Sequence, residues 1–123
     1  MSTILLIESD RASRSLAAWV LQQAGCHVVQ GSRPREAWAL AHRHAPALAL
    51  MGVPSEDDEA LRAARRLRGD PALAGLRLHA LVARAAASRR PLLLAAGFDG
   101  LLAKPLDPRS LLRLLHAELR RSR

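Results

Sequence analysis

Residues 95–105 decide the fold, and they read Ala-Ala-Gly-Phe-Asp-Gly-Leu-Leu-Ala-Lys-Pro. Gly97 ends a predicted helix, and the run Gly100–Ala103 predicts a short strand. Lys104, the only lysine among nineteen basic residues, follows this strand directly and precedes Pro105. A compact ammonium fits a tight anionic site in which a planar guanidinium does not. We therefore interpret Lys104 as a site residue at the end of a strand.

The rest of the chain repeats this alternation of short apolar runs with longer amphipathic segments. Strands covered on both faces are typically continuous apolar runs. Alternation of strands with helices indicates a parallel sheet with helices on both sides. We expect one domain over residues 1–123, with a doubly wound, five-stranded parallel sheet flanked by five helices. The predicted strands are Ile4–Ile7, Cys26–Val29, Leu48–Met51, Leu76–Val82 and Gly100–Ala103, with Gly52 closing the third.

Apolar residues at helical spacing predict which helix faces are buried. Ser9 or Asp10 caps the first helix, which Gly25 ends, and Pro34 opens the second. Ser55, with an acid three residues later, resembles a capping box for the third helix, which extends to about Arg68. A fourth helix covers about residues 88–96, and Asp107-Pro108 starts the last. The predicted buried stripes are Ala12, Leu16, Trp19 or Val20, and Ala24 in the first helix, and Leu111, Leu112, Leu115 and Leu119 in the last.

Composition limits the class of protein. The chain has 123 residues and a net charge of +8, and its single cysteine excludes an internal disulfide. No segment approaches the roughly 18 apolar residues of a membrane span, and the N-terminus does not resemble a signal peptide. We expect a soluble cytoplasmic domain. Residues 1–60 carry a net charge of −2 and residues 61–123 one of +10, which indicates an acidic partner, nucleic acid, or a solvated arginine surface.

Ligand sites of open parallel sheets lie outside the carboxyl ends of the strands. This rule selects Glu8-Ser9-Asp10, Gly52, Val82-Ala83 and Lys104. No glycine-rich phosphate loop follows any strand, and acidic residues after the first strand would repel a phosphate. These observations argue against a nucleotide-binding fold.

Three segments resemble the receiver domain of bacterial two-component response regulators (CheY-like): Thr3–Asp10, Pro46–Gly52 and residues 95–105. The resemblance extends from Thr3 to about Leu119 and implies the strand order 2-1-3-4-5. It also implies phosphoryl transfer from a histidine kinase to an aspartate at the end of the third strand. In the family, two acids after the first strand hold Mg²⁺, and a hydroxyl residue and a lysine bind the phosphoryl group.

Carried over position by position, the family pattern keeps its chemical type only at Glu8 and Lys104. The second acid, the main metal ligand, falls on Ser9, and the phosphoacceptor falls on Gly52. The hydroxyl residue falls on Val82, and the aromatic switch residue falls on Leu101.

The departures from the family pattern remove the groups that phosphoryl transfer needs. Gly52 has no side chain to act as nucleophile, and Val82 offers no hydrogen bond. Glu8 and Lys104 can neutralise each other without a metal ion, and one carboxylate with a serine hydroxyl makes a weak Mg²⁺ site. We therefore predict a degenerate receiver that is not an enzyme, has no cofactor, and has a vestigial pocket of Glu8, Ser9, Gly52, Val82 and Lys104.

Three readings of function remain open. The first is a protein–protein interaction module that recognises an acidic partner, or forms a homodimer, through its fourth helix, fifth strand and fifth helix; the predicted face holds Arg84, Arg89, Arg90, Leu101, Arg109, Arg113 and Arg120. The second is a working receiver with a surrogate acceptor such as Asp57 or Asp58, both of which also suit a helix start. The third is a basic nucleic-acid-binding module, against which the scarcity of aromatic residues argues.

Overall fold

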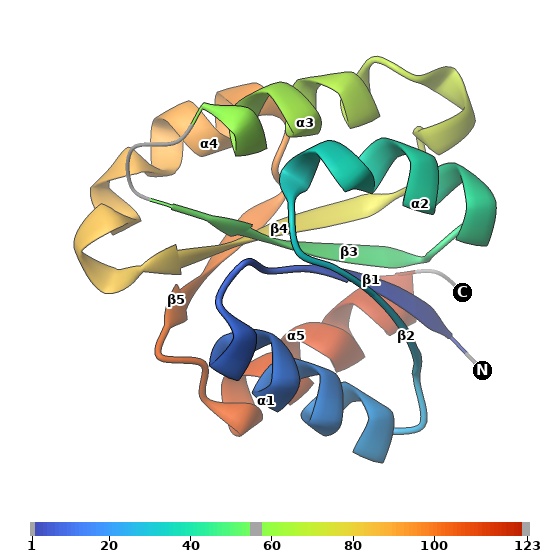
Figure 1. Ribbon diagram of the computed structural model, residues 1–123, viewed down its shortest axis with the longest axis vertical. Helices are drawn as coiled ribbons and strands as arrows, with labels where there is room; N and C mark the ends of the chain where they lie inside the picture. The colour runs from blue at the N-terminus through green and yellow to red at the C-terminus, as the bar shows by residue number, and fades with distance from the viewer. Residues whose placement is uncertain (1, 55–57, 122–123) are drawn as a thin grey trace.

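Five parallel strands form the centre of the molecule (Figure 1). The computed structural model describes residues 2–54 and 58–121. The strand order is β2-β1-β3-β4-β5, as the resemblance implied. The strands are β1 (Thr3–Ile7), β2 (His27–Gly31), β3 (Leu48–Val53), β4 (Arg77–Ala83) and β5 (Gly100–Lys104).

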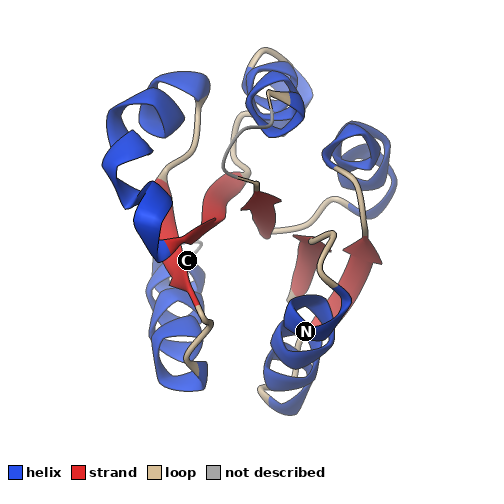
Figure 2. Cartoon of the chain, turned by 60° about the vertical axis from the view of Figure 1, so that its left-hand side comes forward, coloured by secondary structure: helices blue, strands red, loops and turns tan. Residues whose placement is uncertain are grey.

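Helices cover both faces of the sheet, as Figure 2 shows. On one face lie α1 (Arg11–Gln23) and α5 (Pro108–Arg121), and on the other lie α2 (Ala37–His44), α3 (Glu59–Arg68) and α4 (Arg90–Ala96). Short 3₁₀ turns precede α2, β4 and α4; they are η1 (Pro34–Glu36), η2 (Pro71–Leu73) and η3 (Arg84–Arg89). The predicted doubly wound architecture is confirmed.

The sheet divides the core in two because successive side chains of a strand point to opposite faces. Leu5 and Ile7 of β1 pack with the α2–α4 side, whereas Ile4 and Leu6 pack with the α1 and α5 side. All four are at most 1% exposed. Continuous apolar strands therefore supply both halves of the core.

The predicted buried face of α1 is partly wrong. Ala17, Ala18, Val20 and Leu21 are buried, while Trp19 is 60% exposed and Leu16 is also exposed. Ala12 and Ala24 of the predicted stripe are exposed as well, because the side chains that meet the sheet lie on a different side of the helix from the one the spacing selected. The last helix follows its prediction better, with Leu111 and Leu115 fully buried.

Several predicted boundaries also move. Gly52 does not close the third strand, because β3 continues to Val53 and Gly52 pairs with Leu81. Lys104 is the last residue of β5. The N-cap of α3 is Asp58, and the predicted cap Ser55 lies outside the described residues.

A network of charged side chains joins the elements at the amino-terminal edge of β4 and β5. Arg68 at the end of α3 donates to the carbonyls of Gly97 and Leu76, at 2.7 and 2.5 Å, and pairs with Asp99. Arg77 links Asp99 to Glu118 of α5, at 3.2 and 2.7 Å. We call Arg68, Arg77, His79, Asp99 and Glu118 the amino-edge network.

Within the amino-edge network, Glu118 is almost fully buried. Its carboxylate accepts from Arg77 and lies 3.0 Å from Nε2 of His79. Burial alone would raise the pKa of Glu118, but the hydrogen bonds from Arg77 and His79 outweigh burial and hold the pKa below its ordinary value. The carboxylate thus ties α5 to β4.

No helix in residues 2–54 and 58–121 combines the length and the apolar character that crossing a bilayer requires.

Candidate functional site

The carboxyl ends of β1, β3, β4 and β5 bring the sequence-selected residues to one edge of the sheet. Ile7 pairs with Met51, so Glu8 and Gly52 are the next residues along two adjacent strands. Ala83 pairs with Lys104 on the other side of β3. The parallel register therefore gathers Glu8, Gly52 and Lys104, as the sequence predicted.

Glu8 and Lys104 form an ion pair across this edge. Nζ of Lys104 lies 2.5 Å from Oε1 of Glu8. The side chain of Glu8 is 2% exposed and that of Lys104 is 25% exposed, so the carboxylate is buried while the ammonium reaches it from the surface. The two residues that the sequence placed at this edge are therefore in direct contact.

Local backbone contacts hold Glu8 in position. Oε2 accepts from the backbone N–H of Asp10 at 2.8 Å, and the Glu8 carbonyl accepts from Nη1 of Arg14 at 2.7 Å. The Glu8 N–H donates to the carbonyl of Gly31 at 3.0 Å. Among the described residues, no donor makes a hydrogen bond to the buried Oε1, so the positive charge of Lys104 is its only compensation. Removing the lysine would leave one oxygen of a buried carboxylate without a partner.

Gly52 allows this arrangement because it has no Cβ. A Cβ on Gly52 would lie 2.5 Å from Oε1 of Glu8 and 2.8 Å from its Cδ. Both distances are well below van der Waals contact. The Glu8 carboxylate thus fills the space into which any side chain at position 52 would extend.

The neighbouring positions offer little further polar chemistry. Asp10 rather than Ser9 caps α1, accepting from the Ser13 N–H at 2.8 Å. The hydrogen bonds from Ser13 lower the pKa of Asp10. Ser9 is exposed beside the ion pair, and Val82 is buried in the core on the α2–α4 side. Leu101 is half-buried against the same core.

These residues do not fit the divalent cation that the receiver resemblance implies. Oε1 of Glu8 is occupied by an ammonium and Oε2 by a backbone N–H. Position 52 offers no side-chain oxygen. Within the described ranges, no group of three His, Cys, Asp or Glu side chains has the geometry of a metal site. Mg²⁺ prefers octahedral oxygen ligands, which these side chains do not supply.

The proposed surrogate acceptors fall at the start of α3. Asp58 is exposed, its backbone carbonyl accepts from the Arg62 N–H at 2.9 Å, and its side chain makes no capping hydrogen bond. Asp57 lies outside the described residues. The hypothesis of a surrogate acceptor therefore stays a hypothesis.

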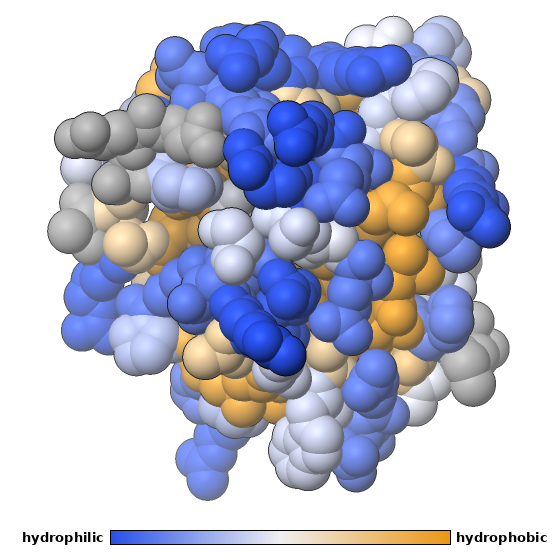
Figure 3. Space-filling view, in the orientation of Figure 1, coloured by the Kyte–Doolittle hydropathy of each residue, from blue (hydrophilic) through white to orange (hydrophobic). Residues whose placement is uncertain are grey.

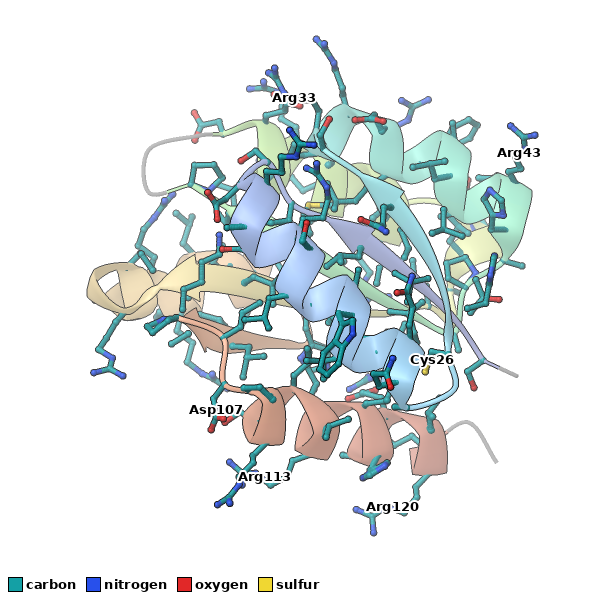
Figure 4. The ribbon with its side chains drawn as sticks, turned by 60° about the horizontal axis from the view of Figure 1, so that its bottom comes forward. Cys26, Arg33, Arg43, Asp107, Arg113 and Arg120 are labelled. Carbon is teal, nitrogen blue, oxygen red and sulfur yellow. The ribbon has the colours of Figure 1, made fainter. Side chains whose placement is uncertain are left out.

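The predicted partner face lies along η3, α4, β5 and α5. Figure 4 shows Arg113 and Arg120 projecting from α5 away from the sheet. The exposed arginines of this face are Arg84, Arg90, Arg109, Arg113 and Arg120, whereas Arg89 is half-buried and has an interaction partner.

Sequence reasoning missed two exposed leucines on this face. Leu92 and Leu94 of α4 are 43% and 39% exposed, whereas Leu93 between them is buried. The signal was present in the sequence, since the run Pro91-Leu92-Leu93-Leu94 within a seven-residue helix cannot turn every side chain toward the sheet. Helix α4 therefore exposes leucines on either side of the buried Leu93, in addition to Arg90.

Comparisons with known proteins agree with this fold. The family model described as "Response regulator receiver domain" matches residues 4–116. An uncharacterized 14.6 kDa protein of Leptolyngbya boryana is 31% identical over 112 residues, which is 91% of this chain and 86% of that protein. The transcriptional regulatory protein GltR of Pseudomonas aeruginosa is 31% identical over 120 residues. That match covers 98% of this chain and 50% of GltR, so this chain spans about half the length of that regulator.

Solved structures show the same fold. The chemotaxis response regulator CheY4 of Vibrio cholerae superposes with a TM-score of 0.86, covering 96% of this chain and 98% of that one at 22% identity. With the strand order, the carboxyl-edge lysine and the family match in agreement, the chain belongs to the family of response regulator receiver domains, the receiving modules of two-component signalling.

Proposed function

We propose that this chain is a receiver domain that does not accept a phosphoryl group and acts as a cytoplasmic protein–protein interaction module. One observation carries the proposal. The Glu8 carboxylate lies where a side chain at position 52 would extend, and it is held there by Lys104 at 2.5 Å. The site thus contains its own anion, which already engages the lysine that a phosphoryl group would otherwise meet.

The chemistry of the site supports this reading. A phosphoryl acceptor needs a nucleophilic oxygen, and position 52 is a glycine. An incoming phosphoryl group would also have to displace Glu8 from Lys104. Leaving the buried Glu8 carboxylate without this partner is expected to cost about 1–3 kcal/mol, since Lys104 itself is 25% exposed. The resting arrangement therefore opposes both the covalent step and the binding of a phosphoryl dianion.

The partner face gives the module a surface for recognition. Leu92 and Leu94 supply exposed apolar area, and Arg90 lies on the same helix. Exposed apolar groups with an arginine rim are typical of protein interfaces. The surplus of positive charge favours an acidic partner and faster encounter at low salt.

Phosphoryl acceptance is tested by incubating the chain with acetyl phosphate and Mg²⁺ and measuring its intact mass. A competent receiver from another protein, treated in parallel, serves as positive control. We expect no increase of about 80 Da, which is the mass that one phosphoryl group adds when an acyl phosphate forms. An adduct that hydroxylamine removes, and that Asp58→Asn or Asp57→Asn abolishes, would overturn the proposal in favour of a surrogate acceptor.

The interaction surface is tested by cross-linking in a cell extract and by sedimentation of the purified chain. Leu92→Ser with Leu94→Ser should remove a cross-linked partner or a homodimer. Leu16→Ser, which alters an exposed leucine on α1, is the matched control and should change neither. Equal losses in both variants would contradict a specific role for α4.

A further inference from the structure

A cavity opens between the start of α2 and α3, and neither Glu8 nor Lys104 lines it. Its volume is about 300 Å³, and it is lined by Pro34, Arg35, Trp38, Glu59, Arg62, Ala63 and Arg66. Figure 3 shows strongly hydrophilic atoms gathered over α3 and the start of α2. We call this cavity the arginine pocket.

The lining of the arginine pocket carries an excess of positive charge. Arg35, Arg62 and Arg66 contribute three guanidinium groups against one carboxylate, that of Glu59. Within the described ranges, no ion pair joins any of these three side chains to a carboxylate.

The one carboxylate of the pocket is already engaged. Glu59 accepts from Nη2 of Arg33 at 3.0 Å and from the backbone N–H of Arg35 at 3.1 Å. The hydrogen bond from Arg33 and that from the Arg35 backbone lower the pKa of Glu59, so it stays ionised and bound to them. It does not neutralise the arginines that face the cavity from α3.

The arginines of α3 repel one another in the absence of an anion. Arg62 and Arg66 are four residues apart on one helix and lie on the same face. Like charges at this spacing destabilise a helix. An anion between them would convert this repulsion into two attractive contacts, so the free pocket is poised to gain from binding one.

Trp38 fixes the geometry of one of these arginines. The guanidinium carbon of Arg66 lies 4.3 Å from the centroid of the Trp38 ring. Nε1 of Trp38 donates to Oδ2 of Asp70 at 2.9 Å, and Nε2 of His42 lies 2.5 Å from the same oxygen. The indole is therefore held in place, and its face holds the guanidinium by cation–π attraction.

We propose that the arginine pocket binds the phosphate group of a small phosphorylated molecule. A planar guanidinium matches the geometry of a phosphate with two parallel hydrogen bonds, and a dianion satisfies more than one arginine at once. The volume lies at the lower end of the range of small-molecule sites, which favours a compact ligand over a polymer. This inference is independent of the proposed lack of phosphoryl transfer at Gly52.

Trp38 provides the readout. The chain has two tryptophans, and Trp19 is on α1, outside the pocket lining. A Trp19→Phe chain therefore reports from Trp38 alone, through the arginine that covers its ring. The chain is titrated with inorganic phosphate and with glycerol phosphate at constant ionic strength, with chloride as the reference anion. We expect saturable changes in emission with the phosphates and none with chloride.

Two variants that each remove one positive charge distinguish phosphate binding in the pocket from nonspecific electrostatic attraction. Arg62→Gln removes a pocket arginine that has no ion pair to a carboxylate in the described ranges and should weaken phosphate binding about tenfold, or 1.4 kcal/mol. Arg43→Gln removes the same charge near the last residue of α2, whereas the pocket lies at the start of that helix. Figure 4 shows Arg43 well apart from Arg33, which precedes α2. This variant should leave phosphate binding unchanged. Circular dichroism confirms that both variants are folded.

The two phosphate sources distinguish the ligand. Equal affinities assign the site to free phosphate, and tighter binding of the ester shows that the organic part contributes; both outcomes support the proposal. It is overturned if neither phosphate saturates up to about 10 mM, or if Arg43→Gln weakens binding as much as Arg62→Gln. It is also overturned if an acidic peptide or duplex DNA binds the pocket more tightly than either phosphate.

Discussion

The two edges of the sheet use buried charge in opposite ways. At the amino-terminal edge, four charged side chains and His79 join α3, β4, α5 and the residue before β5. At the carboxyl-terminal edge, a single ion pair between Glu8 and Lys104 lies over a glycine. The first arrangement distributes each charge over several partners, whereas the second depends on one contact. Structural support and the family's reaction site are therefore separated by the length of the strands.

The largest effect is expected from breaking the amino-edge network at Arg68. Arg68→Met removes hydrogen bonds to two backbone carbonyls and the contact with Asp99. The free energy of unfolding, measured in urea, should fall by about 2–4 kcal/mol. Arg65→Met, at an exposed position of the same helix, should change it by less than about 0.5 kcal/mol. Similar losses in both variants would mean that the network is not what stabilises this edge.

A smaller effect is expected at the carboxyl edge. Lys104→Met leaves the buried Glu8 carboxylate without its counter-charge and should lower the free energy of unfolding by about 1–3 kcal/mol. Adding Glu8→Gln should restore part of the loss, because an amide carries no charge. Arg120→Met on α5 serves as the control. A change near zero for Lys104→Met would mean that the ammonium is fully solvated.

The fit of Glu8 against Gly52 is tested by adding a single methyl group. Gly52→Ala should cost about 1–2 kcal/mol, because its Cβ overlaps the Glu8 carboxylate. The same substitution in a Glu8→Ala background should cost less, with a coupling energy of at least about 0.5 kcal/mol. Gly75→Ala is the control, since nothing lies within 4 Å of its added Cβ. Additive losses at positions 8 and 52 would contradict the close approach.

The smallest effect is expected in the loss of stability at acidic pH. The pKa of Glu118 is lower in the folded chain than in the unfolded one. Its contribution to stability is therefore present above the unfolded value of about 4.3 and is lost as the pH falls through the folded value. Urea unfolding between about pH 5 and pH 3 should show a steeper loss for the natural chain than for Glu118→Gln, by on the order of 1 kcal/mol at most. Parallel curves would place the acid sensitivity elsewhere.

Predictions from the sequence succeeded for the strands and for the edge of the sheet at which they end. Continuous apolar runs identified the five strands, and the rule that parallel strands end at one edge brought Glu8 and Lys104 together before any coordinates. Such predictions failed where the rotation of a helix about its axis decides which side meets the sheet. Leu16 and Trp19 suited a buried stripe by spacing, but α1 turns the side that carries Ala17, Ala18 and Leu21 toward the sheet.

The approach of the Glu8 carboxylate to Gly52 also could not be predicted. From the sequence, a glycine at position 52 indicates only the loss of the phosphoacceptor. The structure shows in addition that the Glu8 carboxylate occupies the space beside it. The arginine pocket was equally hidden, because Arg35 and Trp38 are more than twenty residues from Arg62 and Arg66 in the chain.

The counter-ion of Lys104 is encoded in the same polypeptide, so it can be neither added nor withdrawn by an upstream enzyme. Under the proposed function, every copy of this domain is active as soon as it has folded. The cell then adjusts the output of the module by how many copies it synthesises and how quickly it degrades them.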